Sequence, residues 1–409
     1  MTGPSAPTVV VAGAFDTKRE ALDLLCARLR ELGCAVHRVD FGVADHASDA
    51  ETTPERLAAA TGTTMEAVRA SGRASALDTM GTAVAAEVER LHGAGSLDAF
   101  VAIGGSGAGT VFGAVAPRLP FGVPKVLTST IVAGDTRGYL QGTDAVLVYP
   151  VVDVEGTNGV LRDVLGRTAA TAAALAHAHR TREPAPDPVG GHVAMTMFGI
   201  TTRCVSAARE RLETGGAEVS VFHANGTGGA TLERLVSEGR VDAVLDVTTT
   251  ELADLVAGGT LSAGPDRLTA AARHGVPQVV VPGALDTVNF GAPATVPERF
   301  AGRVLHRHNE HVTLMRSDAA ENRRLGELVA ERVGLAPSSS TVVLPMGGFS
   351  ELDAPGMPFW SPEADAAFRE AFLSHVDPAV RVVESTDHVD DPAFAALLVA
   401  ELDAVRDRR

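Results

Sequence analysis

Two glycine-rich turns hold the residues whose types and spacing are best suited to chemistry. They lie at residues 104–110 and 225–229, and each follows an apolar run and precedes a run with helical periodicity. A turn made of glycines lets backbone N–H groups approach an anion closely, and the helix that follows adds unpaired N–H groups and a partial positive charge. The first turn therefore predicts a phosphate-binding loop.

Neither turn is a standard nucleotide-binding motif. The first turn has no lysine after its last glycine, and neither turn forms a G-x-G-x-x-G fingerprint with an acidic residue at the right distance. The second turn could bind phosphate, hold the carboxylate of a second substrate, or serve packing alone. We predict that it binds substrate through Asn225, Gly226, Thr227, Gly228 and Gly229.

Small polar residues follow the predicted strands in the first half of the chain. Hydroxyl groups suit the oxygens of a polyphosphate, a lysine supplies a point charge, and carboxylates can hold a hydrated Mg²⁺ ion. ATP and Mg²⁺ are therefore the predicted cofactors, and the sequence leaves the metal ligands open. The alternative for Asp16 and Thr17 is a helix N-cap. The predicted cofactor-binding residues are Asp16, Thr17, Lys18, Gly104, Gly105, Ser106, Gly107, Thr128, Ser129, Gly134, Asp135 and Thr136.

The second half of the chain offers candidates for catalysis. Glu251, Asp286 and His308 stand near predicted strand ends, where a carboxylate or an imidazole can act as a general base. Arg316 could bind the carboxylate or phosphate of a substrate. Structural alternatives exist, because an acidic residue in the first turn of a helix complements the helix dipole and a histidine can be solvated or structural.

The composition limits the class of protein. The chain has 409 residues, a formal net charge of -16 and a sequence pI near 5.2, which argues against a nucleic-acid-binding surface. No apolar run approaches the roughly 20 residues that a membrane-spanning helix needs. Three cysteines without C-x-x-C spacing fit a reducing compartment. We therefore expect a cytoplasmic protein with small-molecule ligands and no nucleic-acid or membrane partner.

Apolar runs rich in β-branched residues alternate with helical patterns along the chain, which predicts an α/β fold with parallel sheets. Residues 1–180 form the predicted N-terminal nucleotide-binding subdomain, residues 181–191 a proline-rich linker, and residues 192–409 the C-terminal subdomain. Short segments recur in both halves, at 97–99 and 241–243 and again at 122–124 and 275–277. We predict two Rossmann-like subdomains related by internal duplication and facing a shared cleft.

An ordered series of motifs runs from about residue 8 to residue 375. It comprises residues 13–18, 104–107, 134–136, 195–199, 222–229, 248–251, 262–267, 282–286 and 312–316. The series resembles a poorly characterised bacterial and fungal family, which is similar to the N-terminal ATP-binding region of a plant tobamovirus-resistance protein. The resemblance implies a two-subdomain α/β protein that binds ATP and forms a homodimer. Asn225 departs from the threonine of the family pattern.

Three functions fit these residues. The first, which we favour, is an ATP-dependent enzyme that acts on a small acidic or carbonyl metabolite in the cleft. The second is a hydrolase or lyase that needs no nucleotide and uses the glycine turns for a carboxylate or a phosphorylated metabolite. The third is a regulatory binding module whose ATP occupancy controls a partner surface. The many titratable groups at strand ends of the second half favour an enzyme.

Overall fold

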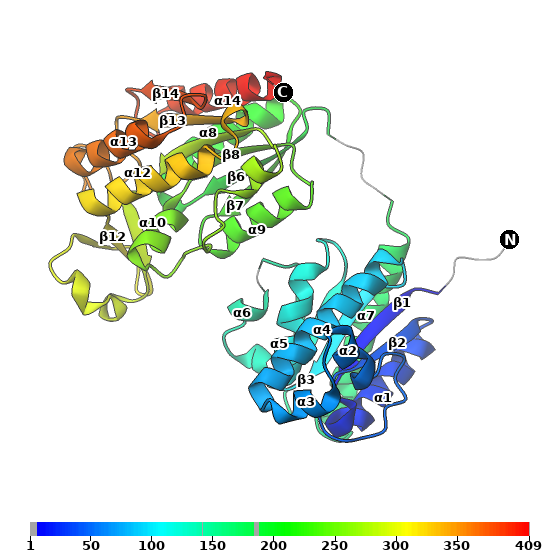
Figure 1. Ribbon diagram of the computed structural model, residues 1–409. Helices are drawn as coiled ribbons and strands as arrows, with labels where there is room; N and C mark the ends of the chain where they lie inside the picture. Colours follow the sequence, from blue (N-terminus) through cyan, green and yellow to red (C-terminus); the bar gives the residue numbers. More distant parts are fainter. Residues whose placement is uncertain (1–5, 141, 184–187, 409) are drawn as a thin grey trace. The chain divides into compact units, whose positions relative to one another are not determined.

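The computed structural model describes residues 6–140, 142–183 and 188–408. The chain folds into two compact units, residues 1–184 (unit 1) and 185–409 (unit 2), each with a sheet and a core of its own (Figure 1). Part of the predicted linker, residues 184–187, lies outside the described residues. In the described part of the chain, no helix is long and apolar enough to cross a bilayer.

Unit 1 is built on a parallel five-stranded sheet in the order β2-β1-β3-β4-β5. The strands are nearly continuous apolar runs, as expected for a parallel sheet that is covered on both faces. They are β1 (Thr8–Gly13), β2 (Ala35–Asp40), β3 (Ala99–Gly104), β4 (Lys125–Ser129) and β5 (Ala145–Val148).

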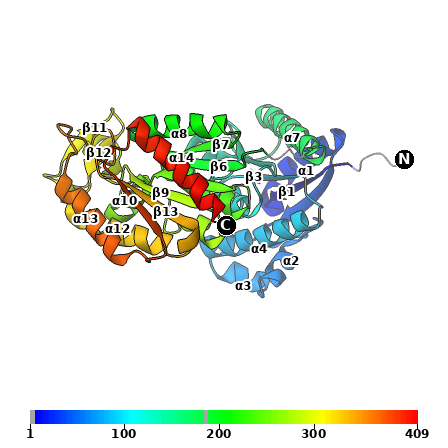
Figure 2. The ribbon, with the colours of Figure 1, turned by 90° about the horizontal axis from the view of Figure 1, so that it is seen from above.

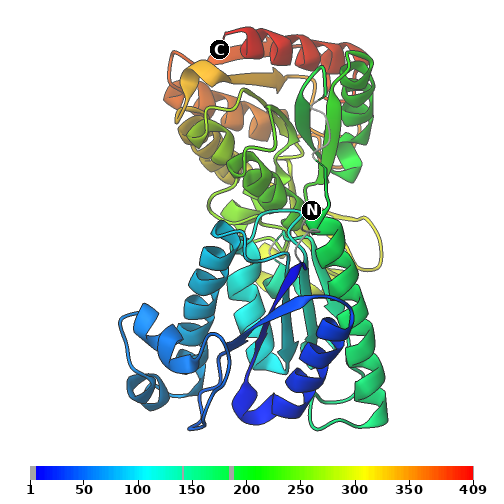
Figure 3. The same cartoon turned by 90° about the vertical axis from the view of Figure 1, so that its right-hand side faces the viewer.

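Helices cover both faces of this sheet, and side chains of β1 alternate between them. Val9 and Val11 join the core beneath α1 and α7, whereas Val10 and Ala12 join the core beneath α4 and α5. Figure 3 shows α7 (green) and α4 (light blue) on opposite sides of the sheet. The helices are α1 (Phe15–Glu31), α2 (Pro54–Ala60), α3 (Met65–Ala70), α4 (Arg73–Gly93), α5 (Ser106–Val115), α6 (Arg137–Leu140) and α7 (Gly159–Arg180), with short 3-10 helices at Ala116–Arg118 and Thr130–Ala133.

Unit 2 contains a parallel six-stranded sheet in the order β14-β13-β9-β8-β6-β7 and a small antiparallel sheet in the order β10-β12-β11. The strands of the parallel sheet are β6 (His192–Met197), β7 (Glu218–His223), β8 (Ala243–Thr248), β9 (Gln278–Gly283), β13 (Ser340–Pro345) and β14 (Arg381–Ser385). Those of the small sheet are β10 (Thr287–Phe290), β11 (Leu305–Arg307) and β12 (Thr313–Arg316).

The parallel sheet of unit 2 is also covered on both faces. One core lies beneath α8 and α14, which Figure 2 shows over the same side of the sheet, and another lies beneath α10, α12 and α13. The helices are α8 (Thr202–Thr214), α9 (Thr227–Ser237), α10 (Thr250–Ala257), α11 (Ala270–Arg273), α12 (Ala319–Val333), α13 (Pro362–His375) and α14 (Pro392–Asp407), with short 3-10 helices at Gly199–Thr201, Pro293–Thr295, Glu298–Phe300 and Pro337–Ser339.

The two units repeat one topology. When only the strands of each parallel sheet are numbered, the strand order is 2-1-3-4-5 in unit 1 and 2-1-3-4-5-6 in unit 2. Asp98 and Asp242 are the middle residues of the repeated segments 97–99 and 241–243, and they make the same contact. Thr8 N donates to Asp98 Oδ2 at 2.6 Å, and His192 N donates to Asp242 Oδ2 at 2.7 Å. The prediction of two parallel-sheet α/β halves is confirmed, and the shared topology and contacts fit a duplication.

Candidate functional site

A pocket opens in unit 1 where the strand order reverses. The chain leaves β1 toward β2 on one side and leaves β3 toward β4 on the other, so the connections after β1 and β3 diverge. In open parallel sheets, ligands bind at this switch point, outside the carboxyl ends of the strands. The pocket measures ≈ 620 Å³ and is lined by the β1–α1 turn, the loop after β2, the end of α3, the start of α4, the β3–α5 turn and Asp153.

The predicted phosphate loop lies in this pocket. Gly104 has φ +148°, a backbone conformation that favours glycine, and Gly105 caps α5 without a side-chain hydrogen bond. Among the described residues, no acceptor contacts the N–H groups of Ser106 and Gly107, which begin the helix. A Cβ atom built on Gly105 meets no atom within 4 Å. The turn therefore presents open N–H groups to the pocket.

Ser129, another predicted cofactor residue, supports this turn from behind. Its Oγ donates to Gly105 O at 3.0 Å and accepts from Ile131 N at 3.4 Å. The Ser129 side chain is buried and is not among the pocket-lining residues. Its role in the structure is to fix the carbonyl side of the turn, so that the N–H side faces the pocket.

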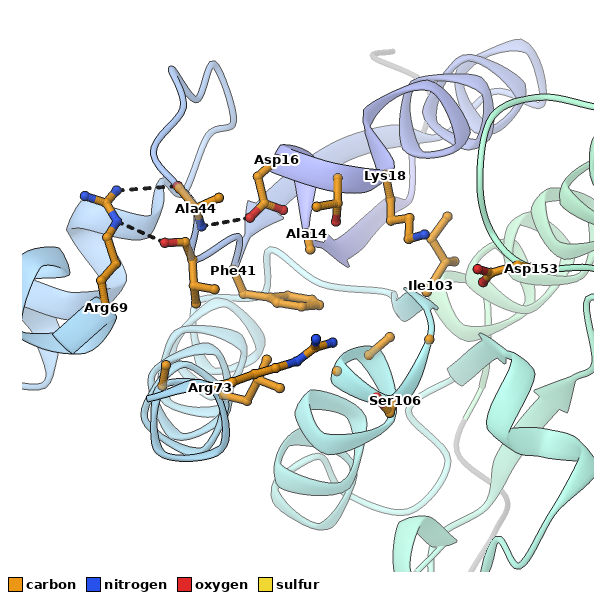
Figure 4. A pocket seen from close by; sticks show the side chains of 18 of the residues that line it. Ala14, Asp16, Lys18, Phe41, Ala44, Arg69, Arg73, Ile103, Ser106 and Asp153 are labelled. Atoms are coloured by element: carbon orange, nitrogen blue, oxygen red, sulfur yellow. Dashed lines mark hydrogen bonds between the residues drawn. The ribbon is translucent and has the colours of Figure 1, made fainter. Parts of the chain in front are cut away.

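Lys18 brings a positive charge to the pocket. It lies near the start of α1 with non-helical dihedral angles, φ -124° and ψ 20°, so the helix is kinked at this residue. Lys18 has no carboxylate within ion-pair distance in the described part of the chain, and Figure 4 shows it on the same side of the pocket as Asp153. The predicted residues Asp16, Thr17 and Lys18 all line the pocket with the glycine turn.

Two arginines that sequence reasoning missed also line the pocket. Arg69 is held by the loop after β2, since its Nε donates to Val43 O at 2.9 Å (Figure 4). Arg73 is exposed and makes no such contact. No local motif marks either arginine, because both belong to helices far from the glycine turn in sequence; only the fold brings them to it.

Asp16 provides a carboxylate oxygen with no donor. Its Oδ2 accepts from Ala44 N at 2.9 Å, whereas its Oδ1 is buried without a hydrogen-bond partner. Mg²⁺ takes oxygen ligands and is commonly held by one or two carboxylates together with the phosphates of a nucleotide. Asp16 and Asp153 are the carboxylates of the pocket lining, so the residues present fit a Mg²⁺ shared with a ligand. Within the described ranges, no cluster of three or more His, Cys, Asp or Glu residues could hold a metal by itself.

The remaining predicted cofactor residues do not line the pocket. Thr128 Oγ1 is buried and pairs with Thr168 Oγ1 at 2.9 Å, so it ties β4 to α7. Gly134, Asp135 and Thr136 belong to the segment between β4 and α6, where the Gly134 N–H donates to Ile131 O at 2.9 Å. These three residues follow β4, which neighbours β3 in the sheet, but they lie outside the pocket lining.

The second glycine turn is occupied by a carboxylate of the protein itself. Glu251 Oε1 accepts from Gly226 N at 2.7 Å and from Gly229 N at 3.0 Å, and Asn225 Oδ1 accepts from Gly228 N at 3.2 Å. The anion on this turn in the structure is the buried side chain of Glu251, and the binding of a substrate by the turn stays a prediction. These N–H groups are therefore not available to a substrate while Glu251 stays in place.

Arg267 organises the strand ends of unit 2, and sequence reasoning did not single it out as a site residue. It is 1% exposed, and its guanidinium binds Asp246 through both Nη atoms and Glu251 Oε2 through Nε at 2.7 Å. Glu233 completes the group at 3.3 Å and also accepts from backbone N–H groups at the start of α11. A single buried arginine among three carboxylates fixes β8, α9 and α10 to one another. Such a network is typical of a structural role.

Asp286 and Arg316, predicted for catalysis and substrate binding, lie in a separate buried cluster. Arg316 contacts Asp365, and Asp353 lies 3.7 Å from its Nη2. Burial, reinforced by the nearby Asp353 and opposed by Arg316, raises the pKa of Asp286 to about 6. Burial likewise raises the pKa of Asp353 and of Asp365 to about 6. Because a single arginine balances three buried carboxyl groups, these carboxyl groups hold their protons to a higher pH in the folded state than in water.

His308, the third predicted catalytic residue, lies on an exposed loop between β11 and β12, with its backbone N–H donating to Val312 O at 3.1 Å. The structure thus gives the three catalytic candidates three different surroundings: Glu251 binds the second glycine turn, Asp286 belongs to the Arg316 cluster, and His308 is exposed. None of them lines the unit 1 pocket.

Comparison with known proteins assigns both units to one family. Residues 7–181 match the N-terminal domain model, and residues 191–406 the C-terminal domain model, of the uncharacterised protein family UPF0261. A UPF0261 protein of Clostridium tetani is 36% identical over 399 residues, covering 96% of this chain and 98% of the relative. One from Mesorhizobium japonicum is 38% identical over 402 residues, covering 97% and 99%.

A plant relative matches a smaller share of its own length. The ToMV resistance protein Tm-1(GCR237) of Solanum lycopersicum is 39% identical over 308 residues, covering 74% of this chain and 41% of the tomato protein. The chain therefore spans less than half of that relative. The matches to both domain models and to the bacterial proteins show that the chain belongs to the uncharacterised protein family UPF0261, which is related to the tomato Tm-1 proteins.

Proposed function

We propose that unit 1 binds ATP with Mg²⁺ in the pocket between the ends of β1 and β3. One observation carries the proposal: the open N–H groups of the Gly104–Gly107 turn and the unpaired cation of Lys18 line the same pocket at the switch point of the sheet. Backbone N–H groups at a helix N-terminus with a nearby lysine form an anion site.

The charge of the pocket supports an anionic ligand. Lys18 and Arg73 line the pocket together with the carboxylates of Asp16 and Asp153, Arg69 pairs with Asp45 at 3.4 Å, and the N-terminus of α5 adds a partial positive charge. The whole chain, by contrast, carries a formal net charge of -16. The N-terminus of α5 and the Lys18 cation nevertheless line the same pocket, which favours a phosphate over a cationic ligand there.

The other wall of the pocket is apolar and suits a nucleobase. Phe41, Ala76 and Ile103 are at most 2% exposed and lie in the lining with Leu77. Figure 4 shows the Phe41 ring bordering the same space as Arg73 and Ser106. Ligand sites commonly combine such an apolar wall with a few polar groups that fix orientation.

Mg²⁺ would be held by Asp16 together with phosphate oxygens. Asp16 contributes the buried oxygen that has no donor, and Asp153 lies on the Lys18 side of the pocket (Figure 4). When bound, the ion would neutralise phosphate charge. Lys18 and the turn would orient the phosphates, while the apolar wall would exclude water from one side of the ligand.

A calorimetric titration tests the proposal. We expect micromolar, Mg²⁺-dependent binding of ATP and of a non-hydrolysable analogue to the full chain. Gly105→Val should weaken binding by more than about tenfold, since the new side chain would enter the open space at the turn that the phosphate is proposed to occupy. Gly93→Val, also in open space but outside the pocket, is the matched control. Equal ATP affinity of both variants would place the site elsewhere.

The same experiment separates a second candidate. A phosphorylated metabolite without a nucleotide would use the same turn and Lys18, and the absence of ATP binding by the wild-type chain would favour it. Turnover of ATP with a small acid or carbonyl compound would support the ATP-dependent enzyme expected from sequence. That activity, the shared cleft, homodimer formation and cytoplasmic location stay predictions.

A further inference from the structure

Arg73 has an unusual position for a cation. It is the first residue of α4, whose N-cap is Gly72 with φ 84° and whose first turn contains no acidic residue. The N-terminus of a helix carries a partial positive charge, so an arginine there is electrostatically unfavourable. Arg73 is exposed at this position, so it is not required there for packing. An anionic ligand at this position would offset the unfavourable placement.

No carboxylate supplies that anion in the described part of the chain. Arg73 has no ion pair and no hydrogen-bond partner, although it lines the pocket. Arg69, near the end of α3, differs because its guanidinium binds the carbonyl groups of Val43 and Ala44 and forms an ion pair with Asp45 at 3.4 Å. Arg73 is therefore free to bind a ligand, whereas Arg69 holds the wall.

Arg73 and Lys18 approach the glycine turn from different walls. Lys18 comes from the β1–α1 turn beside Asp153, and Arg73 extends from α4 toward Ser106 in Figure 4. The N-termini of α4 and α5 both contribute to the lining. A ligand with more than one anionic group would satisfy both cations, while a monophosphate on the turn would leave one of them unmatched.

We propose that Arg73 recognises the outer phosphate of a di- or triphosphate whose inner phosphate lies on the Gly104–Gly107 turn beside Lys18. The inference rests on the proposed function and deepens it, because it makes the number of phosphates the property that the pocket selects. A guanidinium can bind phosphate oxygens through two parallel N–H groups, which a lysine at the same place could not do. Arg73 is thus a specificity residue and not a catalytic one.

The test compares ATP, ADP and AMP on the full chain in the presence of Mg²⁺, by calorimetry. We expect Arg73→Gln to weaken ATP and ADP binding about tenfold to a hundredfold, the range of a charge-assisted hydrogen-bonded contact, and to leave AMP binding within about twofold. Arg73→Lys should recover part of the loss. Lys18→Gln should weaken all three nucleotides. Arg30→Gln, an exposed change on α1 outside the pocket, is the matched control.

A second measurement separates recognition from a structural role. Because Arg73→Gln removes a cation from a helix N-terminus, the thermal midpoint of the ligand-free variant should stay the same or rise, whereas a structural arginine would lower it. Unchanged ATP binding by Arg73→Gln, or an equal loss for AMP and ATP, would overturn the inference while the proposed function stands. Absence of binding of all three nucleotides to the wild-type chain would overturn both.

Discussion

At the scale of single residues, Glu251 shows how one carboxylate can replace a ligand. Glu251 accepts hydrogen bonds from the second glycine turn and pairs with Arg267. Removal of its charge would weaken the hydrogen bonds from the turn and the ion pair with Arg267. We expect Glu251→Gln to lower the free energy of unfolding of unit 2 by about 2–3 kcal/mol, less than the full loss of a buried pair since Arg267 keeps Asp246. Chemical denaturation of the full chain measures this change.

The control for that prediction is Glu213→Gln. Glu213 pairs with Arg209 on the surface of α8, and exposed substitutions usually change stability by less than about 0.5 kcal/mol. A Glu251→Gln variant as stable as the control would contradict this prediction. A variant that loses an enzymatic turnover without losing stability would support the catalytic role that the sequence predicts for Glu251.

At the scale of elements, the loop after β2 forms one wall of the pocket and is fastened by His46. Its Nε2 lies 2.7 Å from Asp40 Oδ2, and its Nδ1 lies 3.0 Å from Ala44 O. Both partners can only accept, so both ring nitrogens must donate, which requires the protonated imidazole. Burial lowers the pKa of His46, but the Ala44 carbonyl and the carboxylates of Asp40 and Asp16 outweigh it and raise the pKa above its usual range.

This loop should therefore respond to pH. Since the folded pKa of His46 is raised, its stabilising contribution is present below about pH 6.5, the usual histidine pKa, and is lost as the pH rises through the folded value. We expect amide hydrogen exchange in residues 41–46, corrected for the intrinsic effect of pH, to accelerate through that window. In His46→Gln this step should disappear, while in the exposed control His274→Gln it should persist. A pH-independent protection factor in the wild type would contradict the prediction.

At the scale of the whole molecule, the sequence contained the architecture but only part of the site. Apolar runs predicted the strands of both parallel sheets because strand periodicity is visible among neighbouring residues, and the recurring segments around Asp98 and Asp242 indicated that the two halves repeat. The place of Arg73 in the pocket and the Glu251–Arg267 pair could not be predicted, since each lies close to a glycine turn that is remote in sequence. Composition also could not show that Glu251 binds the N–H groups of the second glycine turn, whereas those of the first turn are open to the pocket.

The division into two units leads to a last prediction. Every residue that lines the pocket belongs to unit 1, and the cores on both faces of its sheet contain only unit 1 residues. Residues 1–183 alone should therefore unfold cooperatively and bind ATP within about threefold of the full chain, because separate cores make domains independent folding units. Calorimetry and thermal unfolding of the isolated unit check this. A folded unit 1 that no longer binds, beside a full chain that does, would mean that unit 2 contributes residues to the site.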